Sequence, residues 1–216
     1  MVITTLRQIK NALEGLIRES EPSRHRPGYS FSHMASIIAM DPNIIIKLLH
    51  IANRISLSNE IEELPYTIER IISVLGLRRV SEELRKIEAI PVDREHSVRL
   101  QMVQAYCKAV LCAKMAERAF GTKEEAQKYF LAGLLADKLK NPTYKKVLLK
   151  SHDKLKDCLK KIVKNTKTDV IKDAEYLLYD FELDDMTKHP LEEKPGEFFH
   201  LWQETKKKTE SILYKA

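Results

Sequence analysis

Histidine and cysteine, the residues that most often carry chemistry, show no spacing typical of a catalytic or metal-binding site. The histidines form no HxxxH or HExxH pattern and lie at positions 25, 33, 50, 96, 152, 189 and 200. The three cysteines, Cys107, Cys112 and Cys158, form no CxxC pair. The chain also lacks a Gly-rich phosphate loop and a GxSxG nucleophile motif. The residues therefore give no positive evidence for an enzyme.

The sequence shows no sign of export or membrane insertion. Its start, MVITTLRQIK, lacks the apolar core of a signal peptide, and no apolar stretch approaches the roughly 20 residues of a membrane span. We therefore expect a cytoplasmic protein that does not enter the membrane, with reduced thiols. Cys107 and Cys112 lie in an Ala-rich stretch, where a small buried hydrophobic residue is favoured over a redox or metal role.

Two helices between residues 37 and 77 are expected to form the centre of the fold. Asp41 can cap a helix that begins at Pro42 and runs to about Arg54. Thr67 can cap a second helix, which Gly76 ends in a left-handed conformation. Both helices carry apolar stripes that should be buried, made by Ile44, Ile45, Leu48, Leu49, Ile51, Ala52 and Ile55 in the first and by Ile68, Ile71, Ile72 and Leu75 in the second.

The rest of the chain also has helical spacing, with few glycines and no alternating run that demands a strand. The fold class predicted is all-α, a multi-helix bundle. A break is expected at Pro91 and the VDREH that follows it. The further helices expected are 3–18, 77–90, 98–120, 126–139, one in VLLKSHDKLKDCLKKIVKN, one in DVIKDAEYLLYDF, and a last one in EFFHLWQETKKKTESILY. The apolar face predicted for 98–120 is Leu100, Met102 or Val103, Tyr106, Val110, Ala113 and Met115.

Three motifs in the central unit carry a family resemblance. Asp41-Pro42, then LLHIAN, then TIERIISVLGLRRV closely resemble the HDOD domain, the HD-related output domain of bacterial signalling proteins. The resemblance implies an all-helical regulatory domain, descended from the HD phosphohydrolases, that has usually lost their metal site. It is closest over residues 30–140. We therefore expect an HDOD-like domain at 1–140 and a C-terminal helical extension or subdomain at 141–216.

The same resemblance indicates where a metal site would be and what is missing from it. The stretch FLAGLLADKL resembles the family's AGLLHDIG segment, so Ala136 stands where the His of the His-Asp pair would be, and Asp137 remains. Gln104 stands where a further upstream His is sometimes found. These degenerate positions predict no bound metal, because such a site needs several converging imidazoles and carboxylates. A structural or solvated carboxylate is the favoured interpretation of Asp137.

Asn53 has two interpretations. The family commonly has Asn-Ser at the end of this helix, whereas here Asn53 precedes Arg54. A buried Asn at a helix end most often ties down a neighbouring loop through its amide. The alternative is that Asn53 and Arg54 contact a ligand or partner.

The resemblance favours a non-catalytic signalling or regulatory module without a cofactor, which binds a signalling protein or a small ligand. One alternative is a divergent metal-dependent phosphohydrolase. Another is a nucleic-acid-binding protein, suggested by a pI near 9.1 and by lysine clusters at Lys160, Lys161, Lys164 and Lys206 to Lys208. The net charge of +6 is modest for this length, and no helix-turn-helix or zinc motif supports that alternative. The sequence leaves the oligomeric state open.

Overall fold

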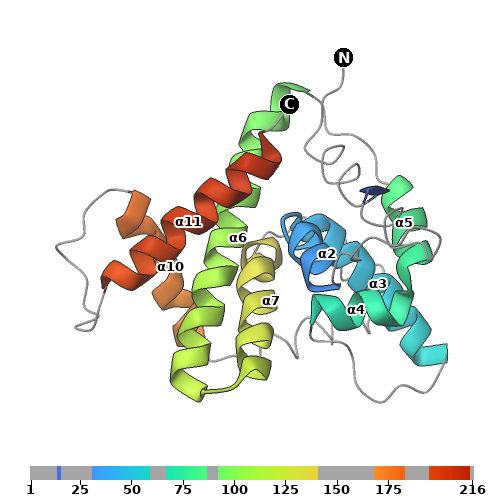
Figure 1. Ribbon diagram of the computed structural model, residues 1–216, viewed down its shortest axis with the longest axis horizontal. Helices are drawn as coiled ribbons and strands as arrows, with labels where there is room; N and C mark the ends of the chain where they lie inside the picture. The colour runs from blue at the N-terminus through green and yellow to red at the C-terminus, as the bar shows by residue number, and fades with distance from the viewer. Residues whose placement is uncertain are drawn as a thin grey trace, which may run out of the picture. The chain divides into compact units, whose positions relative to one another are not determined.

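The structure is a computed structural model that describes residues 14–15, 31–58, 67–86, 92–140, 168–182 and 195–214. Throughout these residues the regular structure is helical, as predicted, and Figure 1 shows its elements. The helices predicted in VLLKSHDKLKDCLKKIVKN and, apart from residues 14 and 15, at 3–18 lie outside the described residues. The helices are α2 (Phe31–Ile38), α3 (Pro42–Ser58), α4 (Ile68–Leu75), α5 (Leu77–Arg85), α6 (Val92–Phe120), α7 (Lys123–Lys140), α10 (Thr168–Glu182) and α11 (Pro195–Leu213).

The chain folds into two compact units. One consists of residues 1–102 with 212–216, and the other of residues 103–211. Residue 102 therefore divides α6 between the units, and residue 211 divides α11. No helix in the described part of the chain is long and apolar enough to cross a membrane.

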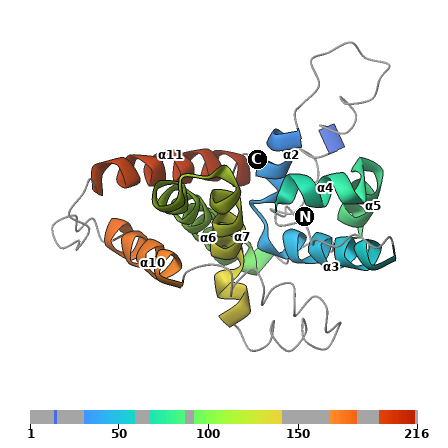
Figure 2. The ribbon, with the colours of Figure 1, turned by 90° about the horizontal axis from the view of Figure 1, so that it is seen from below.

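The first unit is built around α3 and α4, which pack against each other, with α2 against α4 and α5 following directly (Figure 2). α3 begins at Pro42, as predicted, because the Asp41 side chain caps it: Asp41 Oδ1 accepts a hydrogen bond from the Asn43 backbone N–H at 2.8 Å. The α3 stripe is buried as predicted for the six members whose side chains are described, Ile44, Ile45, Leu48, Leu49, Ile51 and Ala52. The α4 stripe is also buried, at Ile68, Ile71, Ile72 and Leu75.

The caps of α4 agree with the prediction in all but one detail. Thr67 Oγ1 accepts from the Arg70 N–H at 3.1 Å, and the Gly76 N–H donates to the Ile72 carbonyl at 2.8 Å. Gly76 has the positive φ of 73° that was expected, but its ψ of 150° lies outside the left-handed helical region. The chain therefore turns away from α4 and begins α5 at the next residue, a backbone path open almost only to glycine.

Three helix ends differ from the prediction by four residues or more. α3 continues to Ser58, four residues beyond Arg54, and α5 ends at Arg85 rather than near residue 90. α6 begins at Val92, so the expected break in VDREH is wrong. A proline ends a preceding helix but does not delay the next one, because a first-turn residue needs no amide partner within the helix.

In the second unit, α6 and α7 form an antiparallel hairpin, visible side by side in Figures 1 and 2. Gly121, with a φ of 70°, ends α6, and Thr122 Oγ1 caps α7 by accepting from the Glu125 N–H at 3.2 Å. The helices come very close at Gly133, where an added Cβ atom would lie 2.8 Å from Cys112 Sγ. Glycine is therefore favoured at this crossing, because an added Cβ atom would force a neighbouring atom to shift.

The buried face of α6 differs from the predicted one. Leu100 is exposed, and Tyr106, Val110, Ala113 and Met115 are only partly buried. Besides Met102 and Val103, the buried side chains are mainly small ones that periodicity in large apolar residues does not register: Ala105, Cys107, Ala109, Leu111, Cys112 and Ala116. Cys107 and Cys112 are free thiols and buried, as expected.

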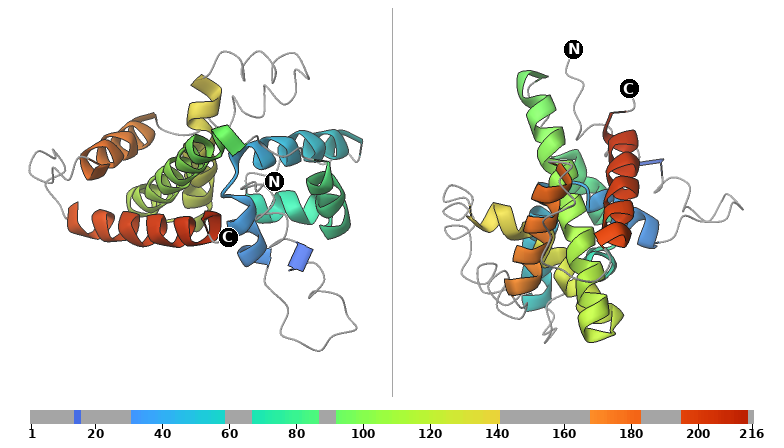
Figure 3. Two further views of the ribbon diagram at one scale, coloured as in Figure 1. Left: turned by 90° about the horizontal axis from the view of Figure 1, so that it is seen from above. Right: turned by 90° about the vertical axis from the view of Figure 1, so that its left-hand side faces the viewer.

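α10 and α11 complete the second unit, and Figures 2 and 3 show α6 between them. α10 packs against α7, and Ile171, Ala174 and Leu177 of α10 are buried. On the other side, Arg118 of α6 pairs with Glu197 of α11 and lies 4.8 Å from the centre of the Phe198 ring. A charged side chain of α6 thus contacts α11.

Candidate functional site

Lys108 is the charged side chain that α6 buries within the second unit. Its side chain is only 4% exposed, although α6 is otherwise lined here by alanine, cysteine and leucine. Burying an ammonium group is costly unless anionic partners and hydrogen bonds replace its hydration. The partners of Lys108 therefore decide what this part of the molecule can do.

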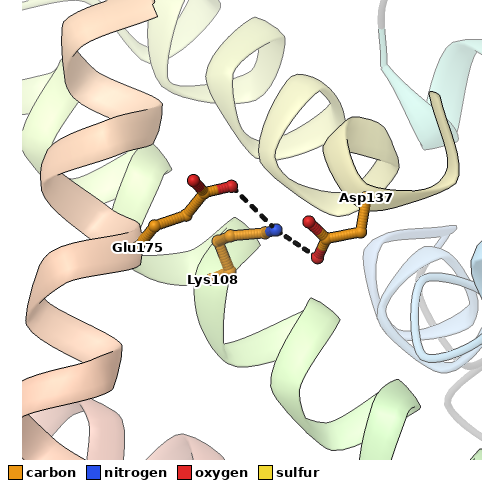
Figure 4. A network of polar contacts seen from close by, with 3 residues as sticks. All are labelled: Lys108, Asp137 and Glu175. Carbon is orange, nitrogen blue, oxygen red and sulfur yellow. Dashed lines mark hydrogen bonds and ion pairs between the residues drawn. The ribbon is translucent and has the colours of Figure 1, made fainter. Parts of the chain in front are cut away.

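Two carboxylates from two other helices meet the Lys108 ammonium, as Figure 4 shows. Lys108 Nζ donates to Asp137 Oδ2, in the last turn of α7, and to Glu175 Oε1, in the middle of α10, at 3.4 Å. The carboxylates are more exposed to solvent than the lysine, since the Asp137 side chain is 59% exposed and the Glu175 side chain 31%. The cluster thus joins α6, α7 and α10 through one buried cation and two partly hydrated anions.

The degenerate HD positions lie around this cluster. Ala136 is buried on α7 next to Asp137. Gln104 is half-buried on α6, one turn before Lys108 and on the same helix face. Asn53 and Arg54 belong to α3, in the first unit, and their side chains lie outside the description, so a role in ligand or partner contact stays a prediction.

A divalent cation does not fit the residues around Asp137. Ala136 offers a methyl group where an imidazole would be needed, and the Lys108 ammonium already holds the retained carboxylate. A charge of +2 about 4 Å from that ammonium would be repelled by about 8 kcal/mol at an effective dielectric constant of about 20. In the described residues, no group of three or more His, Cys, Asp and Glu side chains is arranged to hold a metal ion.

The neighbouring Cys112, one turn after Lys108, is a free thiol whose burial disfavours the thiolate. Burial raises the pKa of its thiol to about 12, although the positive charge of Lys108 opposes the shift. A thiol must lose its proton to attack an electrophile or bind a metal. Burial also raises the pKa of the Tyr106 phenol, so neither group supplies a reactive anion near neutral pH.

Sequence reasoning missed both Lys108 and Glu175. Lys108 left a signal, because it is the one charged residue in QMVQAYCKAVLCA, a helical stretch otherwise suited to a core. Glu175 left none, since acidic residues are frequent along DVIKDAEYLLYDF and the hydrophobic pattern alone does not say which of them faces a buried cation.

A family model matches most of the chain. The family model of the HDOD domain matches residues 12–170. No curated protein and no solved structure matches the chain. The match extends beyond the stretch of closest resemblance seen in the sequence, and it ends within the first turn of α10. A domain boundary between residues 140 and 141 stays a prediction.

Proposed function

Because the chain belongs to the HDOD domain family, we propose that it is a non-catalytic signal-transduction module with a degenerate HD site, which acts by binding a protein partner or a small ligand. The observation that carries the proposal is the pairing of Lys108 with Asp137. It concerns the residue of the HD pair that this chain retains.

An HD-type mechanism needs its aspartate as an open ligand for a cation that activates water. Here the aspartate neutralises a lysine that is itself buried in α6. Freeing Asp137 for a metal would leave the ammonium with Glu175 at 3.4 Å as its remaining carboxylate partner. This pairing supports a role in binding rather than in metal-dependent catalysis.

The catalytic half of the proposal is tested on purified protein. We expect elemental analysis to find no stoichiometric transition metal, and no hydrolysis of nucleotides, cyclic dinucleotides or generic phosphate esters with manganese, iron or magnesium. Lys108→Met serves as the matched variant, because it removes the competing charge and keeps the length of the side chain. Bound metal and turnover in the wild type, both lost in Asp137→Ala, would instead establish a divergent phosphohydrolase.

The binding half is tested in the native host. A tagged copy is captured after cross-linking, and candidate signalling proteins are then purified and titrated against the wild type. The matched variant is Arg54→Ala, which alters the pair of residues, Asn53 and Arg54, expected to contact a ligand or partner. A partner that binds the wild type directly and with a saturable affinity supports the module, whereas turnover without any binding partner contradicts it.

A further inference from the structure

The outer face of α10 carries a stripe of four exposed side chains. They are Asp169, Lys172, Tyr176 and Tyr179. Their spacing of three, four and three residues is that of the a and d positions of a heptad repeat, the seam along which two helices pack. The stripe lies opposite Ile171, Ala174 and Leu177, which pack inward. α10 thus has a second, unpartnered seam within the described part of the chain.

The two tyrosines distinguish this stripe from an ordinary solvated face. Tyr176 is 66% exposed and Tyr179 63%, the highest values among the large hydrophobic side chains that the structure describes. They lie on adjacent turns, about 4.5 Å apart along the helix axis. Tyrosine is enriched at protein interfaces, because it buries a large ring and keeps a hydroxyl for hydrogen bonding.

The order of the four residues along α10 indicates which partner would pack on this seam, namely a second copy of the same helix. Asp169 and Tyr179 each lie five residues from Ala174, on opposite sides, and Lys172 and Tyr176 each lie two residues from it. When two copies of α10 run in opposite directions about a two-fold axis at this level, Lys172 of each copy faces Tyr176 of the other. At the ends, Asp169 of each copy faces Tyr179 of the other.

Both juxtapositions are chemically complementary. An ammonium over a tyrosine ring is a cation–π pair, and a tyrosine hydroxyl donates a hydrogen bond to a carboxylate. A parallel pair would instead stack lysine on lysine and aspartate on aspartate. A two-fold contact uses the same patch twice, so one self-complementary stripe is sufficient.

We propose that the outer stripe of α10, formed by Asp169, Lys172, Tyr176 and Tyr179, is a homodimerisation surface that pairs with the same stripe of a second copy in antiparallel orientation. This inference is independent of the non-catalytic function proposed above. A seam of one 15-residue helix is short, so the dimer is reversible and depends on protein concentration.

The first test measures the mass of the full chain by analytical ultracentrifugation over a range of concentrations. The wild type is expected to show a monomer–dimer equilibrium. Tyr176→Ala/Tyr179→Ala should weaken the dimer about tenfold or more, since tyrosine is enriched among the few interface residues that carry most of the binding energy. Tyr214→Ala, at an exposed tyrosine that directly follows α11, is the control and should leave the equilibrium unchanged. A wild type that stays monomeric, or a dimer indifferent to the double variant, would overturn the proposal.

The second test determines whether the two α10 helices of the dimer run antiparallel, and it uses chains that carry Cys158→Ser. Lys172→Cys and Tyr176→Cys chains, one carrying a tag, are mixed and exposed to a short thiol cross-linker. An antiparallel seam cross-links the mixture faster than either variant alone, because the two positions face each other. Faster cross-linking of Lys172→Cys with itself would mean a parallel contact and refute the assignment. Circular dichroism of each variant confirms that its helices are intact.

Discussion

The cluster around Lys108 predicts an asymmetry between removing the cation and removing its anions. Lys108 is 4% exposed, whereas Asp137 is 59% and Glu175 31% exposed. Once Lys108 is replaced by Met, both carboxylates can recover hydration, and the methionine fills the space of the lysine stem. If Asp137 and Glu175 are replaced instead, the ammonium stays in the core without a carboxylate partner.

The two changes should therefore differ by several kcal/mol in the free energy of unfolding. Replacing a buried charge by an apolar side chain of similar volume is often neutral or stabilising, whereas leaving a buried charge unpaired costs about 3 to 5 kcal/mol. Repulsion between the two remaining carboxylates adds about 1 kcal/mol or less in a water-like dielectric. We expect Lys108→Met to lie within about 1 kcal/mol of the wild type and Asp137→Asn/Glu175→Gln to lose about 3 to 5 kcal/mol.

The assay is denaturant unfolding followed by circular dichroism, with the slope checked for each variant. The triple variant Lys108→Met/Asp137→Asn/Glu175→Gln should recover most of the loss, because it no longer contains a buried charge. Arg78→Gln, which breaks an exposed ion pair with Glu82 on α5, is the control and should change stability by under about 1 kcal/mol. If Lys108→Met costs as much as the double variant, or the triple variant recovers nothing, the reasoning from burial is wrong.

Four further predictions concern the core, a helix crossing, a thiol and the lysines. Leu48→Ala and Ile72→Ala should each cost about 2 to 5 kcal/mol, since both side chains are fully buried; unchanged denaturation midpoints would contradict this. Gly133→Ala should cost about 1 to 3 kcal/mol through overpacking, and Cys112→Ala in the same chain should recover part of that loss by removing the sulfur that the new Cβ meets. Because burial raises the pKa of Cys112 from 9.0 to about 12, its contribution to stability is complete below pH 9 and is lost as the pH rises through 12. The loss, about 4 kcal/mol in all, should be missing from alkaline unfolding curves of Cys112→Ala. Any binding of DNA or RNA through Lys206 to Lys208 should weaken steeply with salt, and no gel shift at low salt would reject the nucleic-acid alternative.

Caps and stripes of large apolar residues could be predicted from the sequence, because their causes are local. The Asp41 side chain caps α3 by accepting a hydrogen bond from the backbone N–H two residues later. The Thr67 side chain caps α4 by accepting one from the backbone N–H three residues later. The α4 stripe follows from a helical period that large aliphatic residues mark clearly. These features need no knowledge of which other helix lies nearby.

The face of α6 could not be predicted in the same way. Its buried side is set by how closely α7 approaches at Gly133, and this favours alanine and cysteine over the larger residues that mark a period. The pairing of Asp137 with Lys108 could not be predicted from the sequence either, because it also depends on how the helices pack. Lys108 and Glu175 lie 29 residues before and 38 residues after that aspartate, and the packing of three helices brings them together.

A buried lysine also bears on where a signal could act in such a module. In a metal-dependent site the charge that balances the carboxylates comes and goes with the cation and with pH. In this chain a covalently attached ammonium supplies that charge, so the cluster joins α6, α7 and α10 without a metal. If the chain has the signalling function proposed above, we expect its input to be read on surfaces that the cluster keeps in place. The outer stripe of α10 is such a surface, because Glu175 lies on the same helix as Tyr176 and Tyr179.

Loss of the Lys108 pairing should therefore loosen the helix that presents the stripe, whereas loss of the tyrosines should leave the pairing intact. Measuring dimerisation in Asp137→Asn/Glu175→Gln and unfolding in Tyr176→Ala/Tyr179→Ala separates the two: weaker dimerisation in the first with unchanged stability in the second is expected, and the reverse pattern would contradict this dependence.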